Sequence, residues 1–350
     1  MPRRCPTIFA RVSRRAWILF AAVSLIWGVP YLFIKLALED GASPMLIAWG
    51  RVALGAALLL PIAWRLGYLR GLGGKVKPLV AFSIAECGLP WWLIPLGEQH
   101  VSSSVAAILI ASLPIVTAVV ALRIDRTETI DRTRAVGLGV GLGGVVLLLG
   151  VDVGGRLHEL LGALAILAAT VCYAAGIFIV KRHFAGVNAI GATAVALGIA
   201  TVMLAPAGIA SLSTWDPGGT AMVSIAILGV VCSALALILF FGLIAEAGAT
   251  RASVITYVNP AVAVALGVLL LGESLTAAVV AGMLLILAGS WLSTGSGTPP
   301  GLAALATSFG RLRRRRVATR ASTLARAADR PAAWAWRSVF TFATGHARAR

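Results

Sequence analysis

The chain has 350 residues, of which 59% are hydrophobic and 12% are charged, and it carries a formal net charge of +17. Its mean hydropathy of +0.94 excludes an ordinary soluble domain, because so few polar side chains cannot cover a water-exposed surface. The positive charge lies in loops and in a tail rather than in a folded basic module, so we expect no nucleic-acid partner.

Ten apolar stretches follow one another along the chain. A helix that crosses a hydrocarbon core of about 30 Å needs about 20 apolar residues. By this measure the spans of the first half are 16–37, 44–64, 78–97, 102–122 and 134–151. Those of the second half are 159–181, 188–211, 219–242, 252–271 and 275–293. No stretch alternates polar and apolar residues as a membrane β-strand does, so the sequence predicts an all-α membrane protein with ten transmembrane helices.

Lys and Arg are concentrated in alternate connections between these spans. Most of the 30 basic residues fall in the N-terminal arm 1–15, the loops 65–77 and 123–134, and the tail 294–350. Because basic residues mark the cytoplasmic side of a membrane protein, we expect both termini in the cytoplasm.

The two halves share landmarks at a constant offset of 146 residues. The matched pairs are Trp27 with Tyr173, Lys35 with Lys181, and Pro114 with Pro260. A unit of five helices ends on the side opposite to its start, so the second copy is inverted about a pseudo-twofold axis in the membrane plane. Many secondary transporters are assembled from such halves, with the substrate site at the seam. The chain therefore divides into a basic arm at 1–15, repeats at 16–151 and 152–293, and an Arg-rich tail at 294–350.

These landmarks resemble the EamA-type repeat of the drug/metabolite transporter superfamily. The resemblance is carried by Trp27-Gly28 with Lys35 and Arg51, by the run 102–114 with Glu128, and by the run 252–260 with Leu271-Gly272-Glu273 and Gly282. It covers about residues 16–293. The first copy departs from it, because Asp125-Arg126-Thr127-Glu128 stands where a Leu-Gly-Glu turn is expected, and the tail beyond residue 294 has no counterpart.

The resemblance implies a carrier that works without an organic cofactor, as an exchanger or driven by a proton or substrate gradient. The superfamily is known for exporters of amino acids, sugars, nucleotide sugars and drugs, so the resemblance leaves the substrate open.

Glu86 is the strongest candidate for a working residue. It lies about seven residues into its span, roughly 10 Å deep at 1.5 Å per residue, where an ionisable side chain is costly and needs an explanation. A carboxyl group at that depth suits proton coupling or a cationic substrate. Two structural interpretations stay open, namely an ion pair with Arg51 and a side chain that reaches the lipid headgroups.

Five further residues are candidates for the transport pathway. Arg51 suits bidentate binding of a carboxylate or phosphate, or it holds two helices together. Trp27 and Tyr173 occupy equivalent mid-helix positions, where aromatic rings bind flat or cationic substrates or simply pack. Tyr257 and Asn259 place hydrogen-bonding groups deep in the ninth span, beside a proline that frees a backbone carbonyl or only kinks the helix.

Proline and glycine mark candidate sites of motion and packing. Pro90, Pro114 and Pro260 are candidate hinges for gating, or else static kinks. Gly139 and Gly143 have the spacing of close helix packing in membranes. Histidine and cysteine lack the spacing of metal ligands, so we expect no metal site.

The tail 294–350 opens with the flexible run Gly295–Pro300 and contains the basic run Arg313–Arg316. Attraction to anionic lipid and plain disorder are both consistent with this composition.

We therefore expect a secondary transporter that exports a small organic metabolite or drug across a bacterial inner membrane by alternating access, with protons as a candidate coupling ion. The connections contain no cluster of acids and histidines that would indicate an enzyme. The alternative is a non-transporting scaffold that acts through its tail.

Overall fold

The computed structural model describes residues 13–124, 132–151, 157–213 and 218–293, which form helices and short connections without a β-strand among them. The first half contains α1 (Arg14–Gly28), α2 (Pro30–Glu39), α3 (Pro44–Arg65), α4 (Val76–Ser83), η1 (Ile84–Gly88), α5 (Leu89–Glu98), α6 (Ser103–Ile110), α7 (Leu113–Ile124) and α8 (Arg132–Val151). The second half contains α9 (Leu157–His183), α10 (Ala189–Leu212), α11 (Gly219–Gly229), η2 (Val230–Leu235), α12 (Ala236–Ala247), α13 (Ala249–Ala252), α14 (Ile255–Leu271) and α15 (Ala277–Ser293). Glu128 and the tail lie outside these residues. The all-α prediction is confirmed for the described part of the chain.

Eight helical stretches of the described residues are long and apolar enough to cross a membrane, judged by length and composition. Several of them are composite: α1 continues into α2, and α4 continues through η1 into α5. The last two helices of the described part of the chain, α14 and α15, are apolar as well but have 17 residues each. Seventeen residues lie at the lower end of the usual range for a membrane span.

Local sequence explains where several helices begin and break. Ser43, Ser102 and Asn188 precede α3, α6 and α10, and their side-chain oxygens each accept a hydrogen bond from a backbone N–H three residues later. Pro30 interrupts the first span, because it lacks the N–H that would continue α1. Gly272 ends α14 with a φ of +65°, in the left-handed region that favours glycine.

Among the described residues, each half has one π-helical turn, which lies in its third span. These turns are η1 at Ile84–Gly88 and η2 at Val230–Leu235, and they start at positions that the 146-residue offset relates. In η2 the hydroxyl of Ser233 donates to the carbonyl of Leu228, 2.8 Å away. A π turn inside an α-helix is rare and is found frequently at functional sites. Its occurrence in both halves makes the region around η1 and η2 a candidate functional site.

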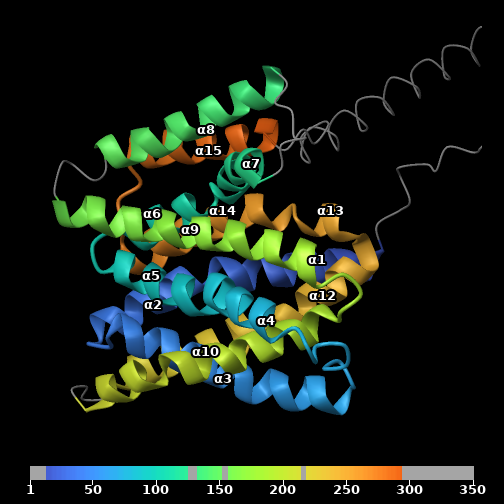
Figure 1. The fold of residues 1–350 in the computed structure, drawn as a ribbon. Coiled ribbons are helices and arrows are strands. Elements are labelled where there is room, and N and C mark those ends of the chain that lie inside the picture. Colours follow the sequence, from blue (N-terminus) through green and yellow to red (C-terminus); the bar gives the residue numbers. More distant parts are fainter. Residues whose placement is uncertain (1–12, 125–131, 152–156, 214–217, 294–350) are drawn as a thin grey trace, which may run out of the picture. The chain divides into compact units, whose positions relative to one another are not determined.

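The helices of the two halves pack against one another in pairs (Figure 1). Residue contacts join α8 to α15, α3 to α10, α5 to α9, α2 to α11, and α6 to α14. Each pair takes one member from each half. All of these helices belong to one compact unit that ends at Gly295.

Glycines bring α8 and α15 into close contact, but they are not the glycines expected from the spacing. A Cβ added to Gly137, Gly141 or Gly144 would collide with α15 or α7. A Cβ added to Gly139 or Gly143 would meet no described atom within 4 Å. The prediction that Gly139 and Gly143 form a close packing face within the chain is therefore wrong, because their side of α8 points away from the other helices.

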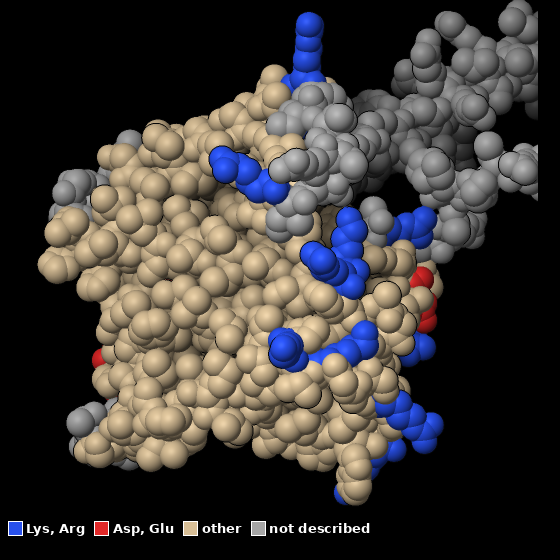
Figure 2. All heavy atoms as spheres, viewed as in Figure 1, with Lys and Arg blue, Asp and Glu red and all other residues tan. Residues whose placement is uncertain are grey.

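Most of the surface in view carries neither acidic nor basic side chains (Figure 2). The Lys and Arg side chains in this view lie over one half of the molecule, toward the end at which α1 begins and α15 ends (Figures 1 and 2). Large apolar side chains such as Trp64, Val202 and Leu269 are more than 70% exposed, as expected for helices whose outer faces contact lipid.

Candidate functional site

A cavity of about 490 Å³ lies between the two halves of the fold. Five of the six residues expected on the transport pathway line it, namely Trp27, Arg51, Glu86, Tyr173 and Asn259. Tyr257 is not among the described residues that line it, whereas its neighbour Thr256 is. Aromatic side chains that the sequence analysis did not single out complete much of the wall, and they are Tyr31, Phe82, Trp91, Phe184, Phe240 and Phe241.

Arg51 is held on the cavity wall by two neighbours. Its side chain is 8% exposed. Its Nε donates to the Ser233 hydroxyl at 3.0 Å, and its Cζ lies 3.9 Å from the centroid of the Trp91 ring. These contacts orient the guanidinium group by a hydrogen bond and a cation–π interaction. No acidic side chain of the described residues forms an ion pair with Arg51.

Glu86 lies in the π turn η1, and its carboxylate packs against α9. A Cβ added to Gly176 would lie 2.6 Å from Oε2 of Glu86, so the missing side chain at Gly176 makes room for the carboxylate. Among the described residues, Glu86 has neither an ion pair nor a hydrogen bond through its carboxylate. The structural pair with Arg51 that the sequence left open is not formed. The two side chains instead line one cavity without forming an ion pair.

Trp27 and Tyr173 line the same cavity from equivalent helices, α1 and α9. The indole N–H of Trp27 donates to the carbonyl of Cys232 in η2, 3.3 Å away. The Trp27 ring contacts Phe240, with ring centroids 4.7 Å apart. The π turn of the second half therefore anchors two wall residues, because Ser233 binds Arg51 and Cys232 binds Trp27.

Asn259 joins α14 to α1. When its side-chain amide is oriented to suit its surroundings, the NH₂ group donates to the carbonyl of Ile255 at 3.0 Å and to that of Ser24 at 3.2 Å. Gly28 lies close by, and a Cβ added there would be 3.2 Å from the Asn259 carbonyl.

The three candidate hinge prolines stand in different local settings. Pro90 is the second residue of α5, just after the π turn η1, and Pro114 is the second residue of α7, just after the break between α6 and α7. Pro260 lies inside α14, which continues through it from Ile255 to Leu271. A role in motion for any of the three stays a prediction.

Beyond one end of the cavity α5 packs closely against α9, and we call this the Gly97–Gly162 end. A Cβ added to Gly162 would lie 2.8 Å from the carbonyl oxygen of Gly97, so the two backbones are in contact. At this end the Lys35 ammonium group donates to the backbone carbonyl of Glu98 at 3.0 Å. The Glu98 side chain is fully buried.

A carboxylate from the second half also caps a helix of the first. Glu273 accepts hydrogen bonds from the backbone N–H groups of Ser103 and Ser104, at 2.7 and 3.0 Å, and from the Ser104 hydroxyl. These donors form the start of α6, where unpaired N–H groups favour a negative charge. The Leu-Gly-Glu turn noted in the sequence thus ends α14 and joins the two halves.

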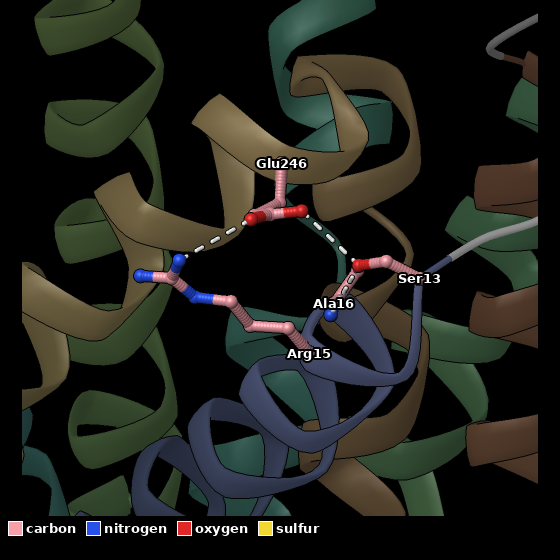
Figure 3. Close-up of polar contacts among 4 residues, drawn as sticks. All are labelled: Ser13, Arg15, Ala16 and Glu246. Carbon is pink, nitrogen blue, oxygen red and sulfur yellow. Dashed lines mark hydrogen bonds and ion pairs between the residues drawn. The ribbon is translucent and has the colours of Figure 1, made fainter.

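The opposite end is where α1 begins and α12 ends, and we call it the Ser13–Glu246 end. Glu246 accepts a hydrogen bond from the Ser13 hydroxyl at 3.1 Å and lies 3.6 Å from Nη1 of Arg15 (Figure 3). The Ser13 oxygen also caps α1 by accepting from the N–H of Ala16 at 3.0 Å. Toward this end the cavity is lined by Phe184, Val187 and Ala189, around the connection between α9 and α10.

Sequence reasoning missed Trp91, Ser233 and Glu98. Trp91 was visible as one of two adjacent tryptophans near Glu86, but nothing in the sequence relates it to Arg51. Glu98 falls one residue beyond the predicted span 78–97, and the sequence analysis drew no inference about it. The described residues contain no group of three or more His, Cys, Asp or Glu side chains that could hold a metal ion.

Comparison with known proteins gives consistent matches. The profile of the EamA-like transporter family matches twice, at residues 14–150 and 160–295. The uncharacterized transporter YvbV of Bacillus subtilis is 26% identical over 275 residues, covering 78% of this chain and 89% of that protein. The uncharacterized inner membrane transporter YedA of Escherichia coli is 29% identical over 266 residues, covering 73% and 82%. A solved crystal structure with 20% sequence identity has a TM-score of 0.55 and covers 80% of this chain and 96% of that chain.

Proposed function

Because the chain belongs to the EamA-like transporter family, with two copies of the family repeat in a multi-pass membrane protein, we propose that it is a secondary transporter of a small organic solute in a bacterial inner membrane. The observation that carries this proposal is the cavity between the repeats, which the Arg51 guanidinium group and the Glu86 carboxyl group both line without an ion-pair partner among the described residues. An inner-membrane location is supported by similarity to the Escherichia coli protein YedA, whose name includes it.

The lining of the cavity indicates the chemistry of the solute. An oriented guanidinium group such as that of Arg51 suits a carboxylate or a phosphate, and the Glu86 carboxylate suits a cationic or hydrogen-bond-donating group. The surrounding rings, among them Trp27, Trp91 and Tyr173, suit a flat or apolar body. We infer a solute of modest size that combines an anionic group with an apolar or aromatic part.

The proposal includes ten spans, with the repeats at 16–151 and 152–293 inverted relative to each other. In Figure 1 the helices lie side by side with their long axes roughly aligned, and α14 and α15 lie among them. If each repeat crosses the membrane five times, the second begins on the side opposite to the first. The packing of helices from one half against helices from the other supports this arrangement.

The orientation that we propose places the arm 1–15 and the tail 294–350 in the cytoplasm. It is supported by the Lys and Arg side chains that gather toward the end where α1 begins (Figure 2). The Ser13–Glu246 end would then face the cytoplasm and the Gly97–Gly162 end the outside.

Alternating access provides the mechanism. The backbones of α5 and α9 are in contact at the Gly97–Gly162 end, and residues around the connection between α9 and α10 line the cavity at the other. We infer that the cavity is closed toward the first end and accessible from the second. A solute that enters from the cytoplasm would reach Arg51 and Glu86, and opening of the Gly97–Gly162 end would release it outside. Export is therefore the direction that we propose, with protons as the candidate coupling ion.

The test is metabolite profiling inside and outside cells that produce the wild type, Glu86→Gln or the matched control Glu39→Gln. Glu39 is exposed at the end of α2 and does not line the cavity. We expect a solute that accumulates outside with the wild type and with Glu39→Gln, but not with Glu86→Gln at equal membrane levels. Equal export by all three proteins would remove Glu86 from the mechanism.

The alternative, a scaffold that acts through its Arg-rich tail, concerns residues outside the described part of the chain. No comparison favours it, since the relatives named above are described as transporters. The same relatives give no support to an enzymatic reaction. Deletion of 296–350 distinguishes the two functions, because a carrier should still transport whereas a tail-dependent scaffold should lose its role.

A further inference from the structure

A second carboxyl group, separate from Glu86, is sealed into the Gly97–Gly162 end. Glu98 is the last residue of α5, and its side chain is 0% exposed. Neither of its carboxyl oxygens has a hydrogen-bond partner among the described residues. An ionised carboxylate that has lost its water and gained no donor is strongly disfavoured. The neutral, protonated form avoids most of that cost.

The nearest cation does not pair with this carboxyl group. Lys35 of α2 donates to the backbone carbonyl of Glu98, and the two side chains form no ion pair. Arg51 of α3 is bound to Ser233 and stacked on Trp91, and it forms no ion pair with Glu98. Glu273, between α14 and α15, accepts hydrogen bonds from the start of α6 and offers Glu98 no donor.

The other elements packed against α5 offer little compensation. Tyr31 of α2 is close enough to Glu98 to interact with it electrostatically. In α6, the hydroxyl group of Ser103 is itself buried without a hydrogen-bond partner among the described residues. At the same end α9 contributes Gly162 and His158, whose ring stacks on that of His100 at 5.7 Å. Glu86 of η1 lines the cavity, whereas Glu98 does not.

We propose that Glu98 is a proton-binding site of the transport cycle, which holds a proton while the Gly97–Gly162 end is closed and releases it when that end opens. On opening, water reaches the carboxyl group, its O–H bond breaks and the proton passes to water. The resulting carboxylate is then free to pair with Lys35, whose ammonium group leaves the backbone carbonyl. This proposal rests on alternating access, but occupancy by the proton is measurable without any transported solute.

The two buried carboxyl groups then have separate tasks. Glu86 faces the cavity, where a bound solute contacts it directly. Glu98 is fully buried next to Gly97 and does not line the cavity, so we expect movement of α5 against α9 to expose it. A proton at Glu98 therefore responds to the state of this end of the molecule, whichever solute the cavity binds.

The first test is infrared spectroscopy of the full-length protein in lipid nanodiscs at neutral pH, without added solute. We expect a carbonyl stretching band of a protonated carboxylic acid in the wild type that is absent in Glu98→Gln and retained in Glu86→Gln. Glu98→Asp keeps a carboxyl group and should shift this band, so the assignment does not depend on the Gln variant alone. A band that is unchanged in Glu98→Gln and in Glu98→Asp overturns the proposal.

The second test asks whether the proton is linked to opening. Spin labels at Glu39 and Leu157, both exposed at this end of α2 and α9, are introduced after the native cysteines are replaced by alanine. We expect the distance between the labels to increase as the pH rises in the otherwise wild-type protein, and to remain constant with Glu98→Gln. A distance between the labels that does not change with pH, or that changes equally in Glu98→Gln, refutes the linkage between the proton and opening. Because neither test uses a solute, failure of the transport proposal would not alter either result.

Discussion

Gly97 of α5 and Gly162 of α9 bring their backbones into contact across the boundary between the two repeats. A Cβ on Gly97 would lie 2.6 Å from the Gly162 carbonyl oxygen, and one on Gly162 would lie 2.8 Å from the Gly97 carbonyl oxygen. The 146-residue offset relates these positions to Leu243 and Ala16, which are buried together at the opposite end. Two glycines are therefore in contact at the Gly97–Gly162 end, whereas a leucine and an alanine occupy the equivalent positions at the opposite end.

Gly162→Ala should open the Gly97–Gly162 end. The added methyl group cannot fit against the Gly97 carbonyl, so α5 and α9 must separate or strain, at a cost of about 1–3 kcal/mol for an overpacked contact. We expect a lower thermal unfolding midpoint in detergent and a longer distance between labels at Glu39 and Leu157. Gly139→Ala is the matched control, because that glycine meets no described atom and alanine is the better helix former. Equal behaviour of the two variants would show that the contact does not hold this end closed.

Arg51→Lys should impair transport although it preserves the positive charge. Lysine cannot reproduce the planar group that stacks on Trp91 and donates through Nε to Ser233. Hydrogen bonds to charged groups are worth about 1.5–3 kcal/mol, so the exported amount of an anionic solute should fall by tenfold or more. Export assays at equal membrane levels provide the measurement. Ser233→Ala removes only one of the two supports and should have a smaller effect.

Glu273→Gln should destabilise the contact between the repeats. The carboxylate accepts from three donors at the start of α6, and a neutral amide offers one oxygen and no charge to these N–H groups. We expect a loss of about 1–3 kcal/mol, measured by thermal unfolding of the purified protein. Glu39→Gln serves as the control at an exposed carboxylate. If both variants unfold at the wild-type temperature, the cap makes no net contribution.

The spacing of landmarks in the sequence predicted a site between the two halves, whereas the local backbone geometry at that site could not be predicted. Trp27 and Tyr173 were identified as equivalent, and both line the cavity. The π turns η1 and η2 were not expected, because a shift of backbone hydrogen bonds by one residue leaves no signature in residue type. Without η2, nothing in the sequence indicates that Ser233 and Cys232 face Arg51 and Trp27.

Helix geometry explains one outcome at the candidate site. Residues two apart on an α-helix point about 200° apart, given 3.6 residues per turn, so Tyr257 and Asn259 cannot both face one cavity. Thr256 and Asn259, three apart, share a face, and both line the wall. The rotation of α14 that selects this face depends on its packing against α1 and α6.

Burial of Glu98 could not be predicted for a related reason. The apolar stretch ends beside it, which places it at the membrane surface by hydropathy alone. Its burial results from Lys35 of α2 and from the close approach of α9 at Gly162, and these neighbours lie more than 60 residues away in the sequence in either direction.

The ionic contact at the Ser13–Glu246 end should contribute little to stability, in contrast to the glycine contact at the other end. The side chains of Arg15 and Glu246 are 78% and 30% exposed, and exposed ion pairs are worth about 0–1 kcal/mol. Ser13 also caps α1, and loss of an N-cap typically costs about 1 kcal/mol. We therefore expect Ser13→Ala to lower the thermal unfolding midpoint more than Glu246→Gln, and the effect of Glu246→Gln to diminish further in high salt. A larger effect of Glu246→Gln that persists in high salt would mean that this carboxylate, rather than the cap, holds α12 against α1.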